Sequence, residues 1–255
     1  MGPCRPSGTV NSPQAKKRNI EPLNEVLEGI GLHGSSVVML VGFGRFERMC
    51  TIGARVAIAV LAAGRSTRMG DFNKLLAVFG GTPLVRLSVQ RAAASGAYKV
   101  IVVTGHMEFE IQEALSGLSF TAVHNDAFAL GLSSSIRAAL QAVPEDCVGV
   151  LIHLADMPLL NERHMSSMID IFNRAQGTSV VRATAFGEPG NPVILPRTLF
   201  RALGELTGDK GARQVIAASG LPVIDVELGL PARCDVDNVE ALEAAGGLPP
   251  IVDPR

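Results

Sequence analysis

From residue 56 onward, the chain alternates short apolar runs with segments of helical pattern, and this alternation constrains the fold more than any other feature. The first run, 56–62, is unbroken and contains Val56, Ile58 and Val60, as in a strand that is buried on both faces. Strands are expected at 56–62, 99–103, 120–124, 148–154, 179–185, 192–195 and 222–226. Strands that alternate with helices pair in parallel and carry helices on both faces. The sequence therefore predicts an α/β, mostly parallel doubly wound sheet.

Start and stop signals mark the helices between these strands. Thr82, Ser133 and Asn161 stand where N-cap side chains are expected, and Pro83 occupies a first helical position. Helices are expected at 83–95, 108–115, 134–143, 162–176, 197–206, 212–219 and from 238 onward. Ligands of such sheets bind beyond the carboxyl ends of the strands. The loops that follow strands are therefore where function is expected.

Residues 1–54 differ in pattern from the rest, because Pro, Gly and Ser dominate the first stretch. Their pattern allows a short helix at 21–32 and a strand at 37–43. Gly42-Phe43-Gly44 imitates a dinucleotide-binding turn, but the third glycine of that motif falls on Glu47. We expect an N-terminal appendage over 1–54, partly disordered or of unknown role, a folded domain over 55–246 and a C-terminal tail over 247–255.

Composition excludes several classes of protein. Aromatic residues make up 4% of the chain and the formal net charge is −1, whereas nucleic-acid binders combine aromatic platforms with strong positive charge. The four cysteines are widely spaced and form no C-x-x-C pair, which disfavours a zinc site or a disulfide framework. No apolar stretch of membrane-spanning length and no signal-peptide pattern is present. We expect a cytoplasmic protein without nucleic-acid or membrane partners.

The loop after the first predicted strand reads LAAGRSTRMGDFNKLL, residues 61–76. Its small residues, 62–64, let the backbone approach a ligand closely. Arg65, Arg68 and Lys74 follow within a few residues. Backbone N–H groups together with Arg and Lys suit a polyphosphate, although the G-x-x-x-x-G-K-[ST] pattern of a P-loop is absent. A charged surface loop is the alternative interpretation.

Carboxylates occupy two other loops. Asp156 directly follows the predicted strand 148–154, where a Mg²⁺ ligand would stand beside substrate phosphates. Asp235 and Asp237 are two residues apart at an expected strand end, so they would project to the same side, and one of them could join Asp156 on a metal ion. The alternative is that these residues are caps: Asp156 would cap the next turn, and Asp237 would cap the last helix. His153, inside a strand, is expected to be a core residue rather than a ligand.

A serine-rich segment, Ser133-Ser134-Ser135, lies at a predicted helix start. A hydrolase elbow needs the form G-x-S-x-G, and here Ser135 stands where the second glycine is required. Hydroxyl groups at a helix N-terminus suit contact with a nucleotide or phosphate, and plain helix capping is equally compatible. Two glycine-rich segments, 187–193 and 208–213, read as loops.

Taken together, these segments resemble the MobA-like nucleotidyltransferase family, in particular its molybdenum cofactor cytidylyltransferase branch. The strings that carry the resemblance are LAAGRSTRMGDFNKLL, VVTG, NDAFALGLSSSIRAAL, LADMP, GEPGNPVILP, LTGDKGAR and DVDN, in the family's order. They span residues 56–242, and the first string and LADMP are the most specific. The resemblance implies a Rossmann-like α/β fold with a nucleotidyltransferase type of sheet, and residues 55–246 as the nucleotidyltransferase domain.

The resemblance also implies roles for individual residues. The implied catalytic residues are Arg68, Lys74 and Asp156, and the implied Mg²⁺ ligands are Asp156 and Asp237. The implied nucleotide-binding residues are Ala62, Ala63, Gly64, Arg65, Ser66, Lys74, Thr104, Gly105, Asn125 and Ser133. The implied acceptor-binding residues are Ser134, Ser135 and Asn191. Asn191 stands where this branch usually has His, and an amide can hydrogen-bond but cannot take up a proton.

The implied activity is transfer of CMP from CTP to a phosphate of a molybdopterin-type cofactor, with Mg²⁺, giving the cytosine dinucleotide and pyrophosphate. Ala63, where the guanylyl branch usually has a second glycine, favours CTP over GTP. Two alternatives stay open. The acceptor is another small phosphate, such as a sugar phosphate, or the protein is a non-catalytic carrier of the cofactor for a client molybdenum hydroxylase.

Overall fold

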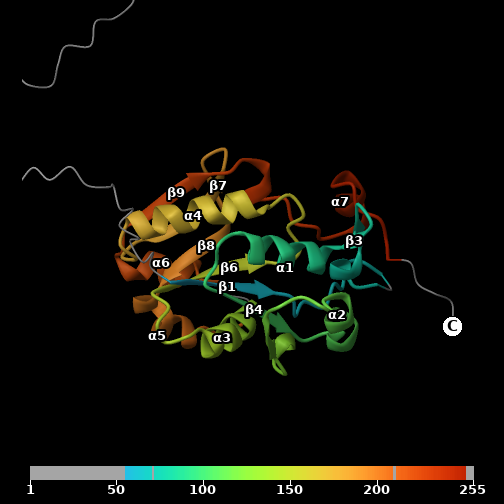
Figure 1. Cartoon of the computed structure of the whole chain (residues 1–255), viewed down its shortest axis with the longest axis horizontal. Coiled ribbons are helices and arrows are strands. Elements are labelled where there is room, and N and C mark those ends of the chain that lie inside the picture. The colour runs from blue at the N-terminus through green and yellow to red at the C-terminus, as the bar shows by residue number, and fades with distance from the viewer. Residues whose placement is uncertain (1–54, 71, 209–210, 251–255) are drawn as a thin grey trace, which may run out of the picture. The chain divides into compact units, whose positions relative to one another are not determined.

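The computed structural model describes residues 55–70, 72–208 and 211–250, and these form one central sheet with helices on both faces (Figure 1). The sheet has seven strands in the order β5-β4-β1-β6-β8-β7-β9. Their bounds are β1 Val56–Leu61, β4 Lys99–Thr104, β5 Thr121–His124, β6 Gly149–Leu154, β7 Val180–Ala185, β8 Glu188–Pro196 and β9 Val223–Glu227. β8 runs antiparallel to β6 and β7, and the other neighbours pair in parallel. The predicted fold class is confirmed.

Helices cover the two faces of the sheet in separate layers. Their bounds are α1 Leu84–Ala94, α2 Glu108–Ala114, α3 Leu132–Ala142, α4 Glu162–Arg174, α5 Phe200–Gly204, α6 Arg213–Ser219 and α7 Val239–Ala244. One core cluster joins the sheet to α1, α2 and α4, and a second joins it to α3, α5 and α6. In Figure 1, α1 and α4 lie above the sheet, and α3 and α5 lie below it.

The unbroken apolar run of β1 follows from its central position. Val56, Ile58 and Val60 contribute to one core cluster, while the alternate residues Ala57 and Ala59 contribute to the other. β4 and β6 pair with β1 on its two sides, so Val60 faces Val102 and His153 across the ladders. A strand with partners on both edges and helices on both faces has no polar side to present.

Helix caps agree with the sequence in one case and differ in two. Asn161 caps α4, accepting a hydrogen bond from the backbone N–H of His164, as predicted. Thr82 does not cap α1, because it pairs with Phe79 in a two-stranded hairpin formed by β2 (Val78–Phe79) and β3 (Thr82–Pro83). Ser133 does not cap α3. That helix begins at Leu132 after a glycine with a positive φ of 96°, and Ser133 lies inside its first turn.

The C-terminal part of the fold also departs from the expected bounds. The predicted helix over 197–206 is a 3-10 turn, η3 (Arg197–Leu199), followed by the short helix α5. β8 begins at Glu188, inside the segment predicted as a loop, and therefore starts earlier than the strand expected from residue 192. A second 3-10 turn, η4 (Leu230–Ala232), separates β9 from the acidic segment 235–237.

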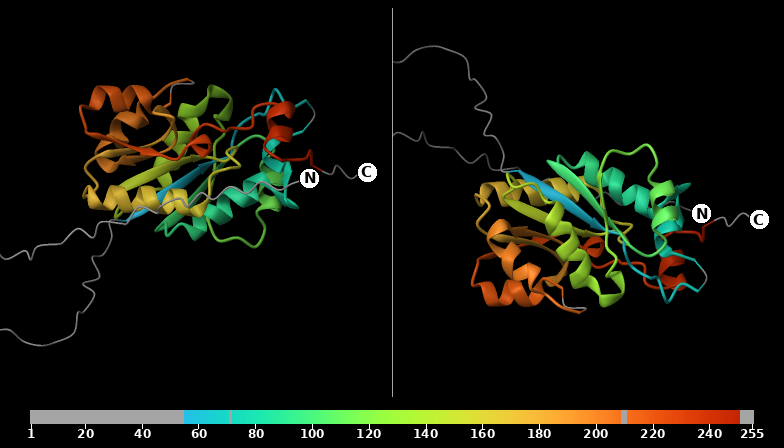
Figure 2. Two further views of the ribbon diagram at one scale, coloured as in Figure 1. Left: turned by 90° about the horizontal axis from the view of Figure 1, so that it is seen from above. Right: turned by 90° about the horizontal axis from the view of Figure 1, so that it is seen from below.

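α7 and the chain that follows β1 lie side by side at one end of the molecule, as the views of Figures 1 and 2 agree. A third core cluster joins them, through Met69 and Leu84 on one side and Val236 and Leu242 on the other. Leu248, in the predicted tail, pairs with Val78 through two backbone hydrogen bonds. The end of the chain thereby holds the loop that contains the predicted phosphate-binding residues.

The appendage predicted over 1–54, with its helix and strand, lies outside the described residues. Within the part of the chain that the structure describes, no helix has the length and apolar character needed to cross a membrane.

Candidate active site

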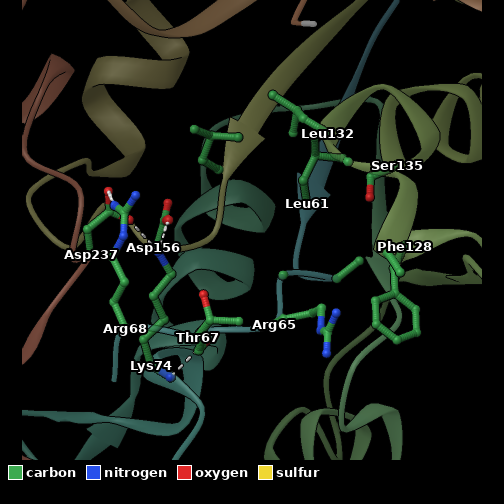
Figure 3. A pocket seen from close by; sticks show the side chains of 16 residues that line it. Leu61, Arg65, Thr67, Arg68, Lys74, Phe128, Leu132, Ser135, Asp156 and Asp237 are labelled. Carbon is green, nitrogen blue, oxygen red and sulfur yellow. Dashed lines mark hydrogen bonds and ion pairs between the residues drawn. The ribbon is translucent and has the colours of Figure 1, made fainter. Parts of the chain in front are cut away.

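A cavity of about 540 Å³ opens at the carboxyl ends of β1 and β6, where the topology predicts a ligand site (Figure 3). Eight residues predicted to bind the nucleotide, to hold the metal or to act in catalysis line it: Ala63, Gly64, Arg65, Ser66, Arg68, Lys74, Asp156 and Asp237. Ser135, predicted to contact the acceptor, lines the same cavity. Segments that are far apart in the sequence thus meet around one space, with cations and carboxylates gathered on one wall in Figure 3.

The loop after β1 folds back on itself through Ser66 and Asn73. Ser66 adopts a positive φ of 51°, which is uncommon for a residue other than glycine. Its hydroxyl donates to Asn73 Oδ1 at 3.0 Å and accepts from the backbone N–H of Lys74 at 3.2 Å. Asn73 is buried and also accepts from the backbone N–H of Leu75 at 3.0 Å, capping the 3-10 turn η1 (Lys74–Leu76). This closure fixes the backbone of Lys74.

Lys74 lies between two carboxylates from different loops. Its Nζ is 2.6 Å from Asp156 Oδ2 and 2.9 Å from Asp237 Oδ1, and its side chain is only 13% exposed. Burial lowers the pKa of Lys74, but the two carboxylates outweigh it, so the pKa lies above its ordinary value. The hydrogen bond from Lys74 lowers the pKa of Asp237, and Arg68, 3.4 Å away, adds to that effect. Both shifts favour the charged forms of Lys74 and Asp237.

Backbone hydrogen bonds position the two carboxylates. Asp156 follows the end of β6, and its carbonyl oxygen accepts from the backbone N–H of Val236 at 3.0 Å. Val236 is fully buried, so it anchors the residues on either side of it. Asn238, not Asp237, caps α7 by accepting from the backbone N–H of Ala241 at 2.8 Å. The capping alternative for Asp237 is therefore wrong, and its carboxylate is free for the site.

The acidic segment also differs from the sequence prediction in its setting. Asp235 and Asp237 do not directly follow a strand, because η4 and a turn come between them and β9. Burial and the negative charges of Asp237 and Asp156 raise the pKa of Asp235 above its ordinary value. A cation placed between these carboxylates would relieve that repulsion.

The donor set fits a hard divalent cation that retains water ligands. Asp156 Oδ1 is buried and has no hydrogen-bond partner among the described residues. Asp156 and Asp237 already converge on one positive atom, Lys74 Nζ. The described residues contain no group of three His, Cys, Asp or Glu side chains that could form a complete cage. Mg²⁺ is typically bound by one or two carboxylates plus water and substrate phosphates, which is the arrangement that this pair could provide.

Five residues predicted to bind the nucleotide do not line the cavity. They are Ala62, Thr104, Gly105, Asn125 and Ser133. Thr104 is fully buried and donates to Glu108 Oε1 at 3.0 Å, while Asn125 donates to the hydroxyls of Ser134 and Ser135 at 2.8 and 3.1 Å. These residues lie behind the cavity wall and hold it together.

The remaining members of this group are equally enclosed. The backbone N–H of Ala62 donates to Val103 O at 2.8 Å, which ties the start of the loop to β4. A Cβ at Gly105 would lie 2.8 Å from that of Phe128, so glycine is required there for close packing. The hydroxyl of Ser133 is buried without a partner among the described residues.

Sequence reasoning missed the apolar side of the cavity. Seven further lining residues are Leu61, Thr67, Phe128, Ala129, Gly131, Leu132 and Leu154. Phe128 belongs to the 3-10 turn η2 (Phe128–Leu130), just before α3. The string NDAFALG, residues 125–131, contained a signal for this apolar side. Its Phe follows the turn-forming pair Asn-Asp and precedes a glycine, so it is expected in a turn and not in the core of a strand or helix.

A second cavity of about 400 Å³ adjoins the first, and Leu132 and Leu154 line both. It lies over β6, β8 and β7 and is bounded by α3 and α6. Asn191 lines this second cavity, whereas Ser135 lines the first and Ser134 lines neither. The three predicted acceptor-binding residues are therefore not brought together in one place.

Gly190 explains how β8 approaches the acidic segment. A Cβ at this position would lie 2.9 Å from the carbonyl carbon of Ala232 and 3.0 Å from its Cβ. Only glycine allows β8 to pack this closely against η4, which leads into residues 235–237.

His153 is a core residue, as predicted. It is fully buried, and burial together with the positive charge of Arg91 lowers its pKa from 6.5 to about 4. Its Nδ1 has no hydrogen-bond partner among the described residues, so its hydrogen bonding is less complete than expected for a core residue. Its ring is therefore neutral at pH 7.

Residues 58–223 match the MobA-like NTP transferase domain. The chain belongs to this family. A curated relative of this MobA-like protein is the "Probable molybdenum cofactor guanylyltransferase" of Natronomonas pharaonis, which is 29% identical over 203 residues, covering 76% of the chain and 98% of the relative. The "Bifunctional protein GlmU" of Desulfotalea psychrophila is 30% identical over 137 residues, covering 53% of the chain and 40% of the relative. The chain spans well under half the length of such GlmU relatives.

Solved structures agree with the family. The Rv0371c homolog from Mycobacterium sp. strain JC1 has a TM-score of 0.67 and 29% identity, with 74% of the chain and 94% of that structure covered. Rv0371c from Mycobacterium tuberculosis has a TM-score of 0.66 and 25% identity, with 76% and 97% covered. The predicted resemblance to MobA-like proteins is confirmed, and the protein is a member of a nucleotidyltransferase family.

Proposed function

We propose that this MobA-like protein transfers CMP from CTP to the terminal phosphate of a molybdopterin-type cofactor, with Mg²⁺. The observation that carries the proposal is the convergence of Lys74, Asp156 and Asp237 beside the glycine-bearing loop, in the first cavity, which the second cavity adjoins at Leu132 and Leu154. A triphosphate and a phosphate acceptor can therefore approach one charged centre from two sides. The name of the Natronomonas pharaonis relative supports a molybdenum cofactor acceptor.

The first cavity would hold the nucleotide. Gly64 has no atom within 4 Å of an added Cβ, so open space lies over the loop where phosphates would rest. Arg65 and Arg68 line this space together with Lys74. Guanidinium groups bind phosphate oxygens with paired N–H donors, and an ammonium group binds as a point charge. The apolar wall that contains Leu132 and Phe128 would face the base and ribose.

The reaction needs positioning and charge neutralisation more than proton transfer. An oxygen of the acceptor phosphate attacks the α-phosphorus of CTP, the bond from that phosphorus to the bridging oxygen breaks, and pyrophosphate leaves. The attacking phosphate is already ionised, so no general base is required. Lys74 and Arg68 would neutralise the charge that develops on the leaving group.

Nucleotidyltransferases generally use a divalent metal, and Asp156 and Asp237 would hold it here. When bound, Mg²⁺ would act as a Lewis acid on the phosphate oxygens. With the ion held by Asp156 and Asp237, Lys74 would be released from these carboxylates to bind the phosphates. The unpartnered Asp156 Oδ1 would be satisfied in that state.

The nucleotide preference rests on Ala63. This residue lines the first cavity, and its methyl group takes up room that a glycine would leave for a purine. A guanylyl transfer is the second candidate, because the Natronomonas pharaonis relative is named a guanylyltransferase. In this second case GTP would be used with equal or greater efficiency.

The test is a turnover matrix. CTP, GTP, ATP and UTP are each combined with molybdopterin, a sugar phosphate and no acceptor, and pyrophosphate release is measured. We expect the highest kcat/KM for CTP with molybdopterin, and we expect Ala63→Gly to raise the efficiency with GTP relative to CTP. Equal or better use of GTP by the wild type would overturn the cytidylyl assignment. Binding of the cofactor without pyrophosphate release would instead favour a carrier protein.

A further inference from the structure

The second cavity contains a guanidinium group whose orientation is fixed by a carboxylate. Arg182 on β7 lines this cavity together with Asn191 and apolar residues of α3, β6, β8 and α6. Its Nε donates to Asp225 Oδ1 at 2.8 Å, and its Nη2 donates to Asp225 Oδ2 at 3.1 Å. Asp225 lies on β9 at the cross-strand neighbour position of Arg182. Two parallel hydrogen bonds of this kind hold the plane of the guanidinium in one orientation.

This pairing leaves half of the guanidinium available. The side-on arrangement uses Nε–H and one Nη2–H, so the end-on edge, formed by Nη1 and the second Nη2–H, has no hydrogen-bond partner among the described residues. The Arg182 side chain is 23% exposed. A fixed, partly buried edge with two adjacent N–H donors matches a ligand group with two adjacent acceptor atoms.

The charge of the pair indicates which kind of group would bind. Asp225 largely cancels the positive charge of Arg182, so attraction for an anion is weak. The direction of the free N–H donors is unaffected by this cancellation. The same donor edge binds the carbonyl oxygen and ring nitrogen of guanine in nucleic-acid recognition. The pair therefore suits an uncharged carbonyl–nitrogen edge of a heterocycle better than a second phosphate.

Arg182 and Lys74 lie in adjoining cavities. Lys74 and Asp156 line the first cavity, Arg182 lines the second, and Leu154 lies between the two. An acceptor whose phosphate reaches Lys74 would extend past Leu154 and place its other end against Arg182. The floor that it crosses is apolar, with Ile136, Ile152 and Val193, as suits a ring system.

We propose that Arg182, held by Asp225, is a specificity-determining residue that binds the heterocyclic end of the acceptor, opposite the phosphate that reacts. This inference rests on the proposed function, because it assigns the acceptor to the second cavity. It also extends that function. The acceptor must carry a heterocycle with two adjacent hydrogen-bond acceptors, and a phosphate without a ring would gain nothing from Arg182.

The test compares two acceptors in Arg182→Lys and Arg182→Gln variants of the full chain. With molybdopterin, we expect the KM for the acceptor to rise about 10- to 100-fold, the loss typical of one bidentate pair, while the KM for CTP stays unchanged. With a ring-free phosphate such as glycerol 3-phosphate, given at high concentration, the variants should match the wild type. Asp225→Asn should raise the acceptor KM less, because one of the two orienting bonds remains. Arg201→Gln is the matched control. It removes an exposed arginine of α5 that pairs with Glu205, and it should leave both KM values unchanged.

The outcomes separate this inference from the proposed function. Turnover of molybdopterin by the wild type tests the proposed function alone. If the wild type instead uses another ring-bearing phosphate, the same comparison is made with that acceptor and the Arg182 inference stands or falls on it. An unchanged acceptor KM in both Arg182 variants, or an equal loss with both acceptors, would overturn the inference while leaving the proposed function intact. A wild type that uses no phosphate acceptor would overturn both.

Discussion

A methyl group added at Gly190 should push β8 and η4 apart beside the candidate site. The added Cβ would overlap the carbonyl oxygen of Ala232 and lie 2.9 Å from its carbonyl carbon, whereas ordinary contacts of a Cβ begin at 3.4 Å. β8 and η4 must therefore move apart by at least the difference, 0.5 Å. Because η4 leads directly into the acidic segment, this movement would shift Asp237 relative to Lys74.

The expected effects of Gly190→Ala are a loss of stability and a larger loss of rate. Overpacking of this kind costs about 1–3 kcal/mol of the free energy of unfolding. A misplacement of about 1 Å in a catalytic constellation costs about 100-fold in rate, so we expect kcat to fall about 10- to 100-fold. Urea denaturation measures the first effect. Pyrophosphate release, assayed at a temperature where the variant is folded, measures the second.

Gly204→Ala is the matched control. Gly204 ends α5, and no atom lies within 4 Å of the Cβ that would be added. Alanine is favoured over glycine in a helix by about 0.5–1 kcal/mol, so this variant should be as stable as the wild type or slightly more stable, with an unchanged rate. If Gly190→Ala behaves like Gly204→Ala in both measurements, the packing of β8 against η4 does not position the site and the reasoning is wrong.

Four further predictions concern Lys74, the carboxylates of Asp156 and Asp237, the N-terminal segment and the buried His153. Lys74→Met should lower kcat by about 100- to 1000-fold, as for loss of one donor at developing charge, and a normal rate would make Lys74 a structural ion-pair residue only. Asp156→Asn and Asp237→Asn should each need more Mg²⁺ or lose activity, and unchanged Mg²⁺ dependence of Asp156→Asn would place the metal elsewhere. A chain that begins at Met49 should fold and turn over, and a soluble but inactive product would show that the domain boundary is wrong. His153 should make the wild type less stable as pH falls from 6.5 towards 4, because the unfolded chain then binds a proton that the buried ring does not; the loss is at most about 3 kcal/mol, and urea denaturation of His153→Leu should show a weaker pH dependence.

The sheet and the charged centre were predictable from sequence because each depends on local pattern. The run 56–62 reads as a doubly buried strand wherever it is placed, and Asp156 follows another such run. In a parallel sheet all strand ends share one edge, so Arg68, Lys74 and Asp156 had to lie near one another. The distance of 2.6 Å between Lys74 Nζ and Asp156 Oδ2 confirms that the loops after β1 and β6 meet.

The wrong caps show where local pattern gives no answer. Ser133 carries the side chain of an N-cap, but Gly131, two residues earlier, adopts the positive φ at which the chain enters the helix. Thr82 was equally suitable by type, yet Phe79 is close enough in the chain to pair with it in a hairpin. Both outcomes depend on tertiary packing, which overrides the preference of a single side chain.

Residues that support the site were invisible for a different reason. Asn73 lines neither cavity and acts by accepting a hydrogen bond from the hydroxyl of Ser66. Arg182 lies in the middle of a strand, where a charged side chain reads as an exposed one. Only the arrangement of β7 beside β9 shows that Asp225 orients it and that a cavity lies in front of it.

The direction of β8 accounts for the second cavity. In a parallel strand, the last residues lie nearest the edge of the sheet that carries the site. The loops that follow strands are therefore where site residues are expected. β8 runs antiparallel to β6, with Val193 opposite Ile152 and Pro196 opposite Gly149. Its beginning, with Gly190 and Asn191, therefore lies at the carboxyl edge of β6. One reversed strand thus places the residues proposed to bind the acceptor beside those proposed to bind the nucleotide, at one edge of the same sheet.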